Sequence, residues 1–122
     1  GEIRSAIGAY RLSLSLARDI DDPYIQLRAI DGLIAIYRQR DEPAQLSAYL
    51  NDRIALTLRT GDDWQHLLTL RTLGEIYQDN GDLAAAYDAF QRALTLAHTL
   101  ERKQVQAELT NRLLSLSARM NN

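Results

Sequence analysis

The sequence predicts an all-α fold in which antiparallel helix pairs are stacked as repeats. Its apolar residues recur with a period of 40 residues over three copies. Six stretches show the apolar spacing of helices between turn signals, and none shows the alternation of a strand. A pattern held over three copies indicates like units that bury their apolar faces against one another. The recurring positions include Tyr10, Leu50 and Phe90, and likewise Leu33, Leu73 and Leu113.

The first two helices are expected at about residues 2–19 and 23–39. Asp22 can cap the second helix through its carboxylate, and Pro23 suits the first helical position because it lacks an N–H that would go unpaired there. Asp21 and Asp22 together place negative charge where a helix begins, which the helix dipole favours. The first helix carries an apolar face whose partner helix is expected in a longer protein or in another copy. This face consists of Ile3, Ile7, Tyr10 and Leu14.

The other four helices are expected at about residues 43–59, 63–79, 82–100 and 102–119. Gly61 ends the third helix and Asp62 caps the fourth, with Gln65 placed to reach back as in a capping box. The last helix is expected to act as a solvating cap, because a repeat array needs a polar outer surface at its end. The charged residues expected to face water there are Arg102, Glu108, Arg112 and Arg119.

The best-formed repeat lies within residues 67–100, as two helices joined by a tight turn at residues 80–82. Its apolar faces consist of Leu70, Leu73, Gly74 and Tyr77 on the first helix, and Ala86, Phe90, Ala93 and Leu94 on the second. This pattern resembles the tetratricopeptide repeat (TPR), except that Leu70 replaces tryptophan and no closing proline follows. The 40-residue period is similar to the long repeats of kinesin light chains, of G-protein-signalling modulators and of many bacterial regulators.

The resemblance implies a right-handed α-solenoid and a single domain over residues 1–122. The parts of this domain would be a half repeat at 1–20, a degenerate repeat at 23–60, the best-formed repeat at 63–100, and a half repeat or capping helix at 102–120. Gly1 is not an initiator residue, so we expect the sequence to come from a longer one.

Aromatic residues take different places in the repeat. Tyr37 and Tyr77 match the buried tyrosine of the family, whereas Tyr49 and Tyr87 fall off the core face and can sit on the outer, convex side. Trp64 aligns with Tyr24 one repeat earlier. It can either anchor a partner or pack over the loop of the neighbouring repeat.

The resemblance also implies where a ligand would bind, because the first helix of each repeat lines a concave groove in this family. Counting from the core positions gives the groove-facing residues Arg28, Asp31, Arg38, Leu68, Arg71, Glu75, Gln78, Glu108, Asn111 and Ser115. Their charges balance, and Arg71 can pair with Glu75 along one helix.

Composition excludes several classes of function. The net charge of −2 argues against a nucleic-acid footprint, and the absence of cysteine excludes disulfides and thiolate metal sites. No run of 18 apolar residues exists, and residues 1–20 lack a basic start followed by an apolar block, so we expect neither a membrane span nor a signal peptide. The absence of cysteine fits a reducing cytoplasm best. His66 and His98 have no metal ligands at suitable spacing, and no serine lies near a catalytic base. We therefore expect no enzyme activity, no cofactor and no metal.

Three functions remain open. The first is a scaffold that takes a peptide or helix of a partner protein into the groove, with Arg28, Arg38, Arg71, Glu75 and Asn111 as its main contacts. The second is a self-assembly module, in which the end helices of two copies complete a repeat between them. The third is a regulatory or sensor fragment of a larger protein whose effector domain lies elsewhere.

Overall fold

The computed structural model describes residues 1–121, which contain six α-helices and no strand. The helices are α1 (Glu2–Asp19), α2 (Pro23–Gln39), α3 (Pro43–Thr60), α4 (Asp63–Asp79), α5 (Leu83–Thr99) and α6 (Lys103–Met120). The all-α prediction is confirmed, and every boundary lies within one residue of its expected place.

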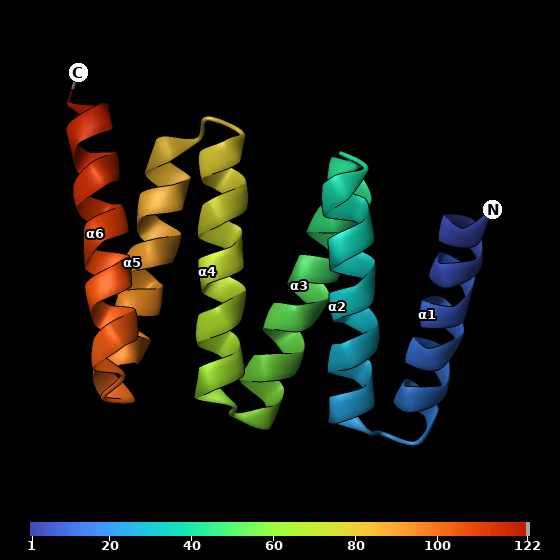
Figure 1. The fold of residues 1–122 in the computed structure, drawn as a ribbon. Helices are drawn as coiled ribbons and strands as arrows, with labels where there is room; N and C mark the ends of the chain where they lie inside the picture. The colour runs from blue at the N-terminus through green and yellow to red at the C-terminus, as the bar shows by residue number, and fades with distance from the viewer. Residues whose placement is uncertain (122) are drawn as a thin grey trace. The chain divides into compact units, whose positions relative to one another are not determined.

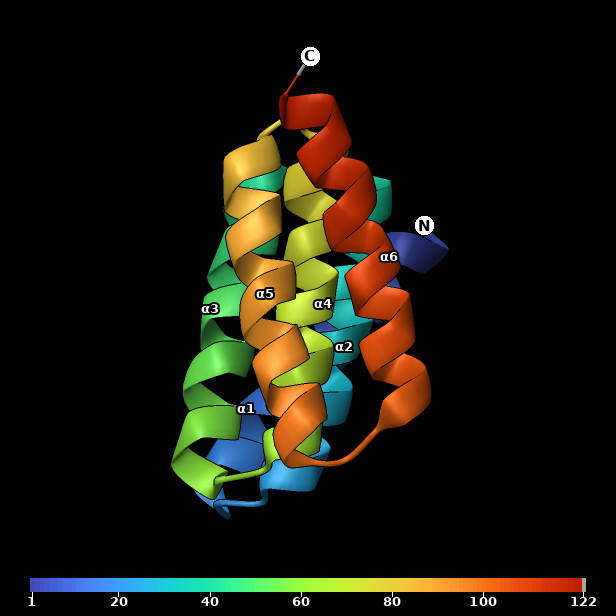
Figure 2. The same cartoon turned by 90° about the vertical axis from the view of Figure 1, so that its left-hand side faces the viewer.

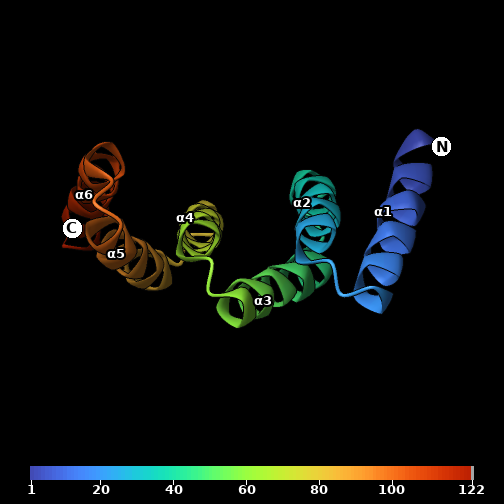
Figure 3. The same ribbon diagram turned by 90° about the horizontal axis from the view of Figure 1, so that it is seen from below.

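The chain divides into two compact units, Gly1–Thr60 with α1, α2 and α3, and Gly61–Asn122 with α4, α5 and α6. Within each unit, consecutive helices run antiparallel and the middle helix packs against both others (Figures 1 and 3). Figure 2 looks onto α5 and α6 of the second unit and the turn that joins them. By the 40-residue register, α2, α4 and α6 are first helices of a repeat, whereas α1, α3 and α5 are second helices. We use these two terms below.

The helices α1 to α5 are each followed by one residue with left-handed backbone, and these residues stand 20 positions apart. After α1, the N–H of Asp21 donates to the carbonyl of Arg18, and the N–H of Asp22 donates to that of Ala17. This is the Schellman arrangement, which satisfies the last carbonyls of a helix. Asp21 therefore serves the end of α1, and only Asp22 caps α2. The five residues are Asp21, Asp41, Gly61, Gly81 and Glu101, with φ between 53° and 82°.

Aspartate side chains start three of the helices. The carboxylate of Asp22 accepts hydrogen bonds from the backbone N–H groups of Tyr24 and Ile25, at 3.0 and 3.1 Å. Asp62 and Asp82 do the same for α4 and α5, at 3.1 and 3.2 Å. The predicted caps of α2 and α4 are confirmed, and they fix where each first helix begins.

The core of unit Gly61–Asn122 surrounds the fully buried ring of Phe90. This ring lies so close to α4 that a Cβ added to Gly74 would sit 2.6 Å from it. Trp64 packs against the same core, with the guanidinium of Arg102 4.5 Å from its ring centroid. Arg102 stands in the turn before α6, so the expectation that Trp64 packs over a neighbouring loop is confirmed. The core residues are Leu67, Leu70, Ala86, Phe90, Ala93, Ala97, Leu109, Leu113 and Leu116.

In unit Gly1–Thr60, α1 packs against α2 through Tyr10, whose ring lies over Gly32 and occupies the place of its missing side chain. Leu14 and Ala17 of α1 are buried. The central helix α2 supplies most of the core, through Leu27, Ala29, Ile30, Leu33, Ile34 and Tyr37.

The tyrosine predictions are right for one residue and wrong for another. Tyr37 is 3% exposed, whereas Tyr77, expected to be buried, is 36% exposed. The ring of Tyr37 stacks on that of Tyr49, with centroids 5.8 Å apart and planes 9° apart. The place of Tyr49 in the next repeat is taken by Ala89, which is too small to cover Tyr77. Tyr49 thus packs on the core of its unit, and Tyr87 is half-buried against the core of the other unit.

Candidate interaction surface

Four charged side chains connect the two first helices of unit Gly61–Asn122, and three of them are predicted contacts. Arg112 Nη2 lies 3.0 Å from Glu75 Oε2, and Arg112 Nε lies 3.6 Å from Glu108 Oε1. Arg71 Nη1 lies 3.6 Å from the same Glu108 oxygen. In place of the predicted pair between Arg71 and Glu75 along α4, each of these residues pairs with a charge on α6. The network therefore ties α4 to α6.

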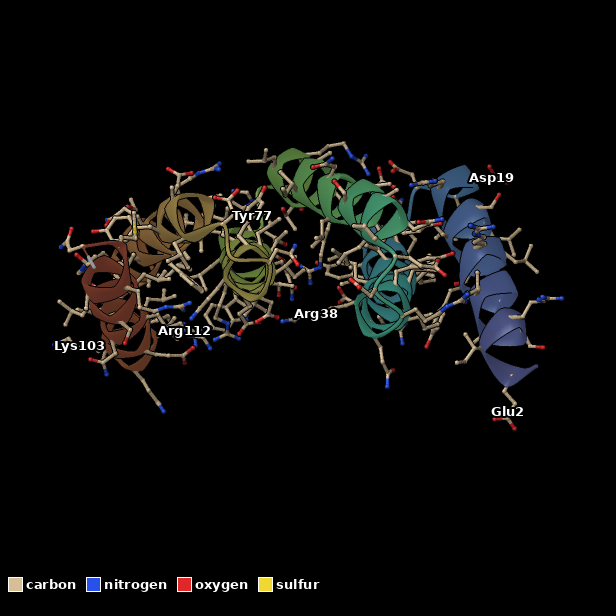
Figure 4. All side chains as sticks on the ribbon, turned by 90° about the horizontal axis from the view of Figure 1, so that it is seen from above. Glu2, Asp19, Arg38, Tyr77, Lys103 and Arg112 are labelled. Atoms are coloured by element: carbon tan, nitrogen blue, oxygen red, sulfur yellow. The ribbon has the colours of Figure 1, made fainter. Side chains whose placement is uncertain are left out.

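Arg112 was expected to face water, but it points from α6 toward α4 (Figure 4). Its guanidinium lies 5.3 Å from the ring centroid of Phe90, where it can make a cation–π contact. In the repeat register, Arg112 corresponds to Gly32, which lies under the aromatic ring of Tyr10. This position thus contacts the aromatic residue of the preceding second helix in both units. Arg102, Glu108 and Arg119 are exposed as expected, and the Arg102 guanidinium also lies over the ring of Trp64.

The remaining predicted contacts of this unit differ in exposure. Leu68, expected in the groove, is half-buried and packs against the core cluster. Gln78 is half-buried on α4, whereas Asn111 and Ser115 are exposed on α6. The face shared by α4 and α6 therefore offers Asn111 and Ser115 as open polar groups beside the charge network.

The three predicted contacts of unit Gly1–Thr60 lie on α2. Arg28 and Arg38 are exposed, but Asp31 is tied to α3 by Arg53. Arg53 Nε donates to Asp31 Oδ1 at 2.6 Å and Arg53 Nη2 donates to Asp31 Oδ2 at 3.3 Å. The Arg53 side chain is only 8% exposed, so this bidentate pair compensates a nearly buried charge. Asp31 is thus held by α3, while its own side chain remains 51% exposed.

Arg53 is a residue that reasoning from the sequence missed. It stands in the buried stripe of α3, where the next repeat has the small Ala93. An arginine at a core position of one repeat, beside an aspartate on the preceding helix, is a signal that could have revealed the pair.

A second missed cluster joins α1 to α3. Arg11 Nη2 donates to the hydroxyl of Tyr37 at 3.2 Å. Hydrogen bonding to Tyr49 and the nearby Tyr37 phenol raise the pKa of Arg11 above its ordinary value. A cleft of about 490 Å³ lies between α1 and α3, and its lining includes Arg11 and Tyr49. Beside this cleft, Arg18 Nη2 pairs with Asp52 Oδ2 at 3.1 Å. These contacts position α1 on the rest of its unit.

The side of α1 away from Arg11 is apolar and open. Leu12, Leu16 and Ile20 are all more than half exposed. Together with smaller residues and Ile25 they line a shallow groove of about 380 Å³. Leu16 is 55% exposed, although the equivalent Leu56 of α3 is 5% exposed.

The described residues hold no cluster of three or more potential metal-ligating His, Cys, Asp or Glu side chains. His66 is buried, and its pKa is lowered by that burial and by the positive charge of Arg92, against a smaller opposing effect of Asp63. In the repeat register His66 corresponds to Gln26 and Gln106, which donate to the backbone carbonyls of Ala17 and Ala97. His66 thus occupies a position that is filled by a packing residue in the other two copies.

Within residues 1–121, no helix combines the length and the apolar character needed to cross a bilayer. In comparisons with known proteins, no protein family matches the sequence and no curated protein is similar to it.

Proposed function

We propose that this chain is a non-catalytic scaffold of TPR-like repeats that binds a peptide or helix of a partner protein. The proposed binding surface in unit Gly61–Asn122 is the face shared by α4 and α6. The observation that carries the proposal is the ion-pair network of this face, which connects two first helices through Arg71, Glu75, Glu108 and Arg112.

The network favours binding over catalysis for a physical reason. Side chains that already hold one another in place lose little conformational entropy when a ligand arrives. Their charges are mutually compensated, so they offer hydrogen-bonding capacity without a strong field of one sign. The open groups beside them, Asn111 and Ser115, can both donate and accept hydrogen bonds, which suits the backbone of a peptide.

A peptide bound to such a polar face is expected to have an affinity in the micromolar range, or about −8 kcal/mol. No single contact dominates, because each charge keeps its present partner while the ligand binds. The affinity should therefore depend on several residues of α4 and α6 and fall moderately with added salt.

The test uses a phage-displayed library of 16-residue peptides, selected on the whole chain. The most enriched peptide is synthesised with a fluorescent label, and its affinity is measured by fluorescence anisotropy. We expect Arg71→Gln combined with Asn111→Ala to weaken binding at least about tenfold, or about 1.4 kcal/mol. Arg92→Gln, an exposed arginine on α5, is the control and should bind as the unchanged chain does.

Circular dichroism verifies that each variant keeps its helices. The proposal is refuted if no peptide is enriched, or if the enriched peptide binds the double variant and the unchanged chain equally well.

A further inference from the structure

The two end helices each expose a face that is covered elsewhere in the chain. In α5, the face toward α4 includes Ala89, Phe90 and Ala93, all of which are buried. The equivalent residues of α1 are Ala9, Tyr10 and Ser13, none of which is buried. The same face of α1 continues through Leu16 and Ile20 along the apolar groove. This face of α1 is therefore apolar and exposed, as expected of a surface that packs against a first helix.

The last helix, α6, also exposes a face that is buried in its counterpart α4. In α4, the residues Leu67, Leu70 and Gly74 are buried, and Gly74 lies under the ring of Phe90. Their equivalents in α6 are Ala107, Thr110 and Leu114, all of them exposed, with Leu114 64% exposed. This face of α6 is uncharged and mostly small, so a second helix can approach it closely. Thus α6 exposes the face that would pack against a second helix, and α1 exposes the face that would pack against a first helix.

The packing of α4 on α5 supplies a register for joining these faces. Shifting the contact of Gly74 with Phe90 by the repeat period sets Leu114 of α6 against Tyr10 of α1. The same antiparallel register brings Ala107 to Ala17.

Charges at the two helix ends match this register. Lys103, at the start of α6, comes opposite Asp19 and Asp21, at the end of α1. Arg119, near the end of α6, comes within about one turn of Glu2. Figure 4 labels Glu2, Asp19 and Lys103 at these helix ends. Opposite charges at both ends favour this pairing of α6 with α1, and the antiparallel direction follows from the packing of α4 on α5.

We propose that a second copy of this chain covers the apolar face of α1 with its own α6, completing a repeat between the two copies. The contact is head to tail, because it uses different surfaces of the two copies. Such contacts continue into rings or filaments unless something blocks one end. This interaction uses a different face from the peptide-binding surface proposed above and does not depend on it.

The first experiment follows the size of the whole chain by sedimentation velocity between about 10 μM and 1 mM, the range in which weak interfaces are populated. The unchanged chain should form larger species as its concentration rises. Leu16→Glu on α1 and Leu114→Glu on α6 should each leave a monomer, because each places an unpaired charge in the apolar contact. Leu58→Glu is the matched control: Leu58 is 62% exposed on α3, outside both faces, so its variant should associate as the unchanged chain does.

The second experiment mixes the two single variants in equal amounts. Leu16→Glu retains an intact α6 and Leu114→Glu retains an intact α1, so together they should form a dimer that cannot grow further. Circular dichroism establishes that both variants are folded before mixing.

Three results would overturn the proposal. The unchanged chain could remain a monomer at the highest concentration. Leu114→Glu could associate as well as the unchanged chain, which would mean that another α1 covers the face. The two monomeric variants could also fail to dimerise when mixed. Peptide binding, measured separately by anisotropy, is expected to survive in both variants, so failure of this proposal is distinguishable from failure of the proposed function.

Discussion

The helices α1 and α5 occupy the same place in the repeat but differ in what covers them. Both helices have a carbonyl near their end that accepts a hydrogen bond from a glutamine of the next helix. Gln26 of α2 donates to the carbonyl of Ala17 in α1 at 3.3 Å, and Gln106 of α6 donates to that of Ala97 in α5 at 3.1 Å. Both also place an aromatic ring against the following first helix. However, the backbone of α5 packs against both α4 and α6, whereas the backbone of α1 packs against α2 alone within its unit and reaches α3 only through side chains.

This difference shows that the repeat pattern encodes two faces on each second helix. One face contacts the first helix that follows, and α1 satisfies it fully. The other contacts the first helix that precedes, and in α1 it remains open although its residues are still apolar or small. The sequence of α1 therefore carries an apolar packing surface that is exposed in the described chain.

The largest expected effect comes from removing the aromatic ring of each helix. Phe90→Ala should lower the free energy of unfolding by about 3 to 5 kcal/mol, because it empties a fully buried site. Tyr10→Ala should cost only about 1 kcal/mol, because the ring of Tyr10 is partly exposed. Urea unfolding measures both, with the fluorescence of Trp64 reporting on its own unit and circular dichroism on the helices. Equal losses would show that the two helices are equally covered.

A second test exchanges the packing of one unit for that of the other. The contact of Gly74 with Phe90 corresponds, one repeat earlier, to Ile34 and Leu50. Gly74→Ile alone should cost about 3 kcal/mol, because its side chain would overlap the buried ring. Adding Phe90→Leu should restore about 2 kcal/mol, because the pair then matches Ile34 and Leu50.

The control for this exchange is Gly8→Ala, since a Cβ there meets no atom within 4 Å. Its stability should rise by up to about 1 kcal/mol through helix propensity alone. If the effects of Gly74→Ile and Phe90→Leu simply add, the two units do not share a packing rule, and the comparison fails.

A smaller effect is expected at the ion pair between Asp31 of α2 and the nearly buried Arg53 of α3. Asp31→Asn should lower the free energy of unfolding by about 1.5 kcal/mol, because it removes the charge that Arg53 contacts with two nitrogens. Asp52→Asn should change it by less than about 1 kcal/mol, because its pair with Arg18 is exposed on both sides. Urea titrations of the two variants provide the comparison. Equal effects would mean that the burial of Arg53 adds nothing to its pair.

Local signals in the sequence predict most of this fold. The caps at Asp22 and Asp62, the turn glycines and the 40-residue period lie close together in the chain or repeat within it, so each helix boundary was found to within one residue. These features depend on the backbone and on neighbouring side chains, which the sequence displays directly.

The candidate site was predicted less well, because its side chains depend on contacts between helices. Glu75 and Arg71 pair with α6 and not with each other, which helical spacing alone cannot indicate. Tyr77 matches the buried tyrosine pattern, but its burial depends on whether residue 89 is large enough to cover it. Of the predicted face positions, Asn111 and Ser115 are exposed, whereas Leu68 packs against the core, and Arg71 and Glu75 pair with charges on α6.

The smallest effect concerns pH and His66, which stands at the repeat position that Gln26 and Gln106 occupy in the other copies. The lowered pKa of His66 means that folding favours the neutral form of its side chain. As the pH falls through the ordinary pKa of about 6.5, the unfolded chain therefore binds more protons than the folded chain does. The free energy of unfolding should therefore fall as the pH decreases through this value, by less than about 1.4 kcal/mol per pH unit. His66→Gln, which installs the residue found at Gln26 and Gln106, should remove this contribution.

Urea unfolding at pH 7.5, 6.5 and 5.5 measures the effect. His98→Gln, on the exposed side of α5, is the matched control for the loss of an imidazole ring. The interpretation is contradicted if His66→Gln shows the same pH dependence as the unchanged chain.

The most direct test of the uncovered face is amide hydrogen exchange measured along the chain at several protein concentrations. In dilute solution, the amides of α1 should exchange faster than those of α5, because α1 lacks the helix that covers α5. Raising the concentration should slow exchange in α1 and α6 and leave α5 unchanged, because a second copy then covers both open faces. Equal protection of α1 and α5 in dilute solution, or exchange in α1 and α6 that is independent of concentration, would contradict this account.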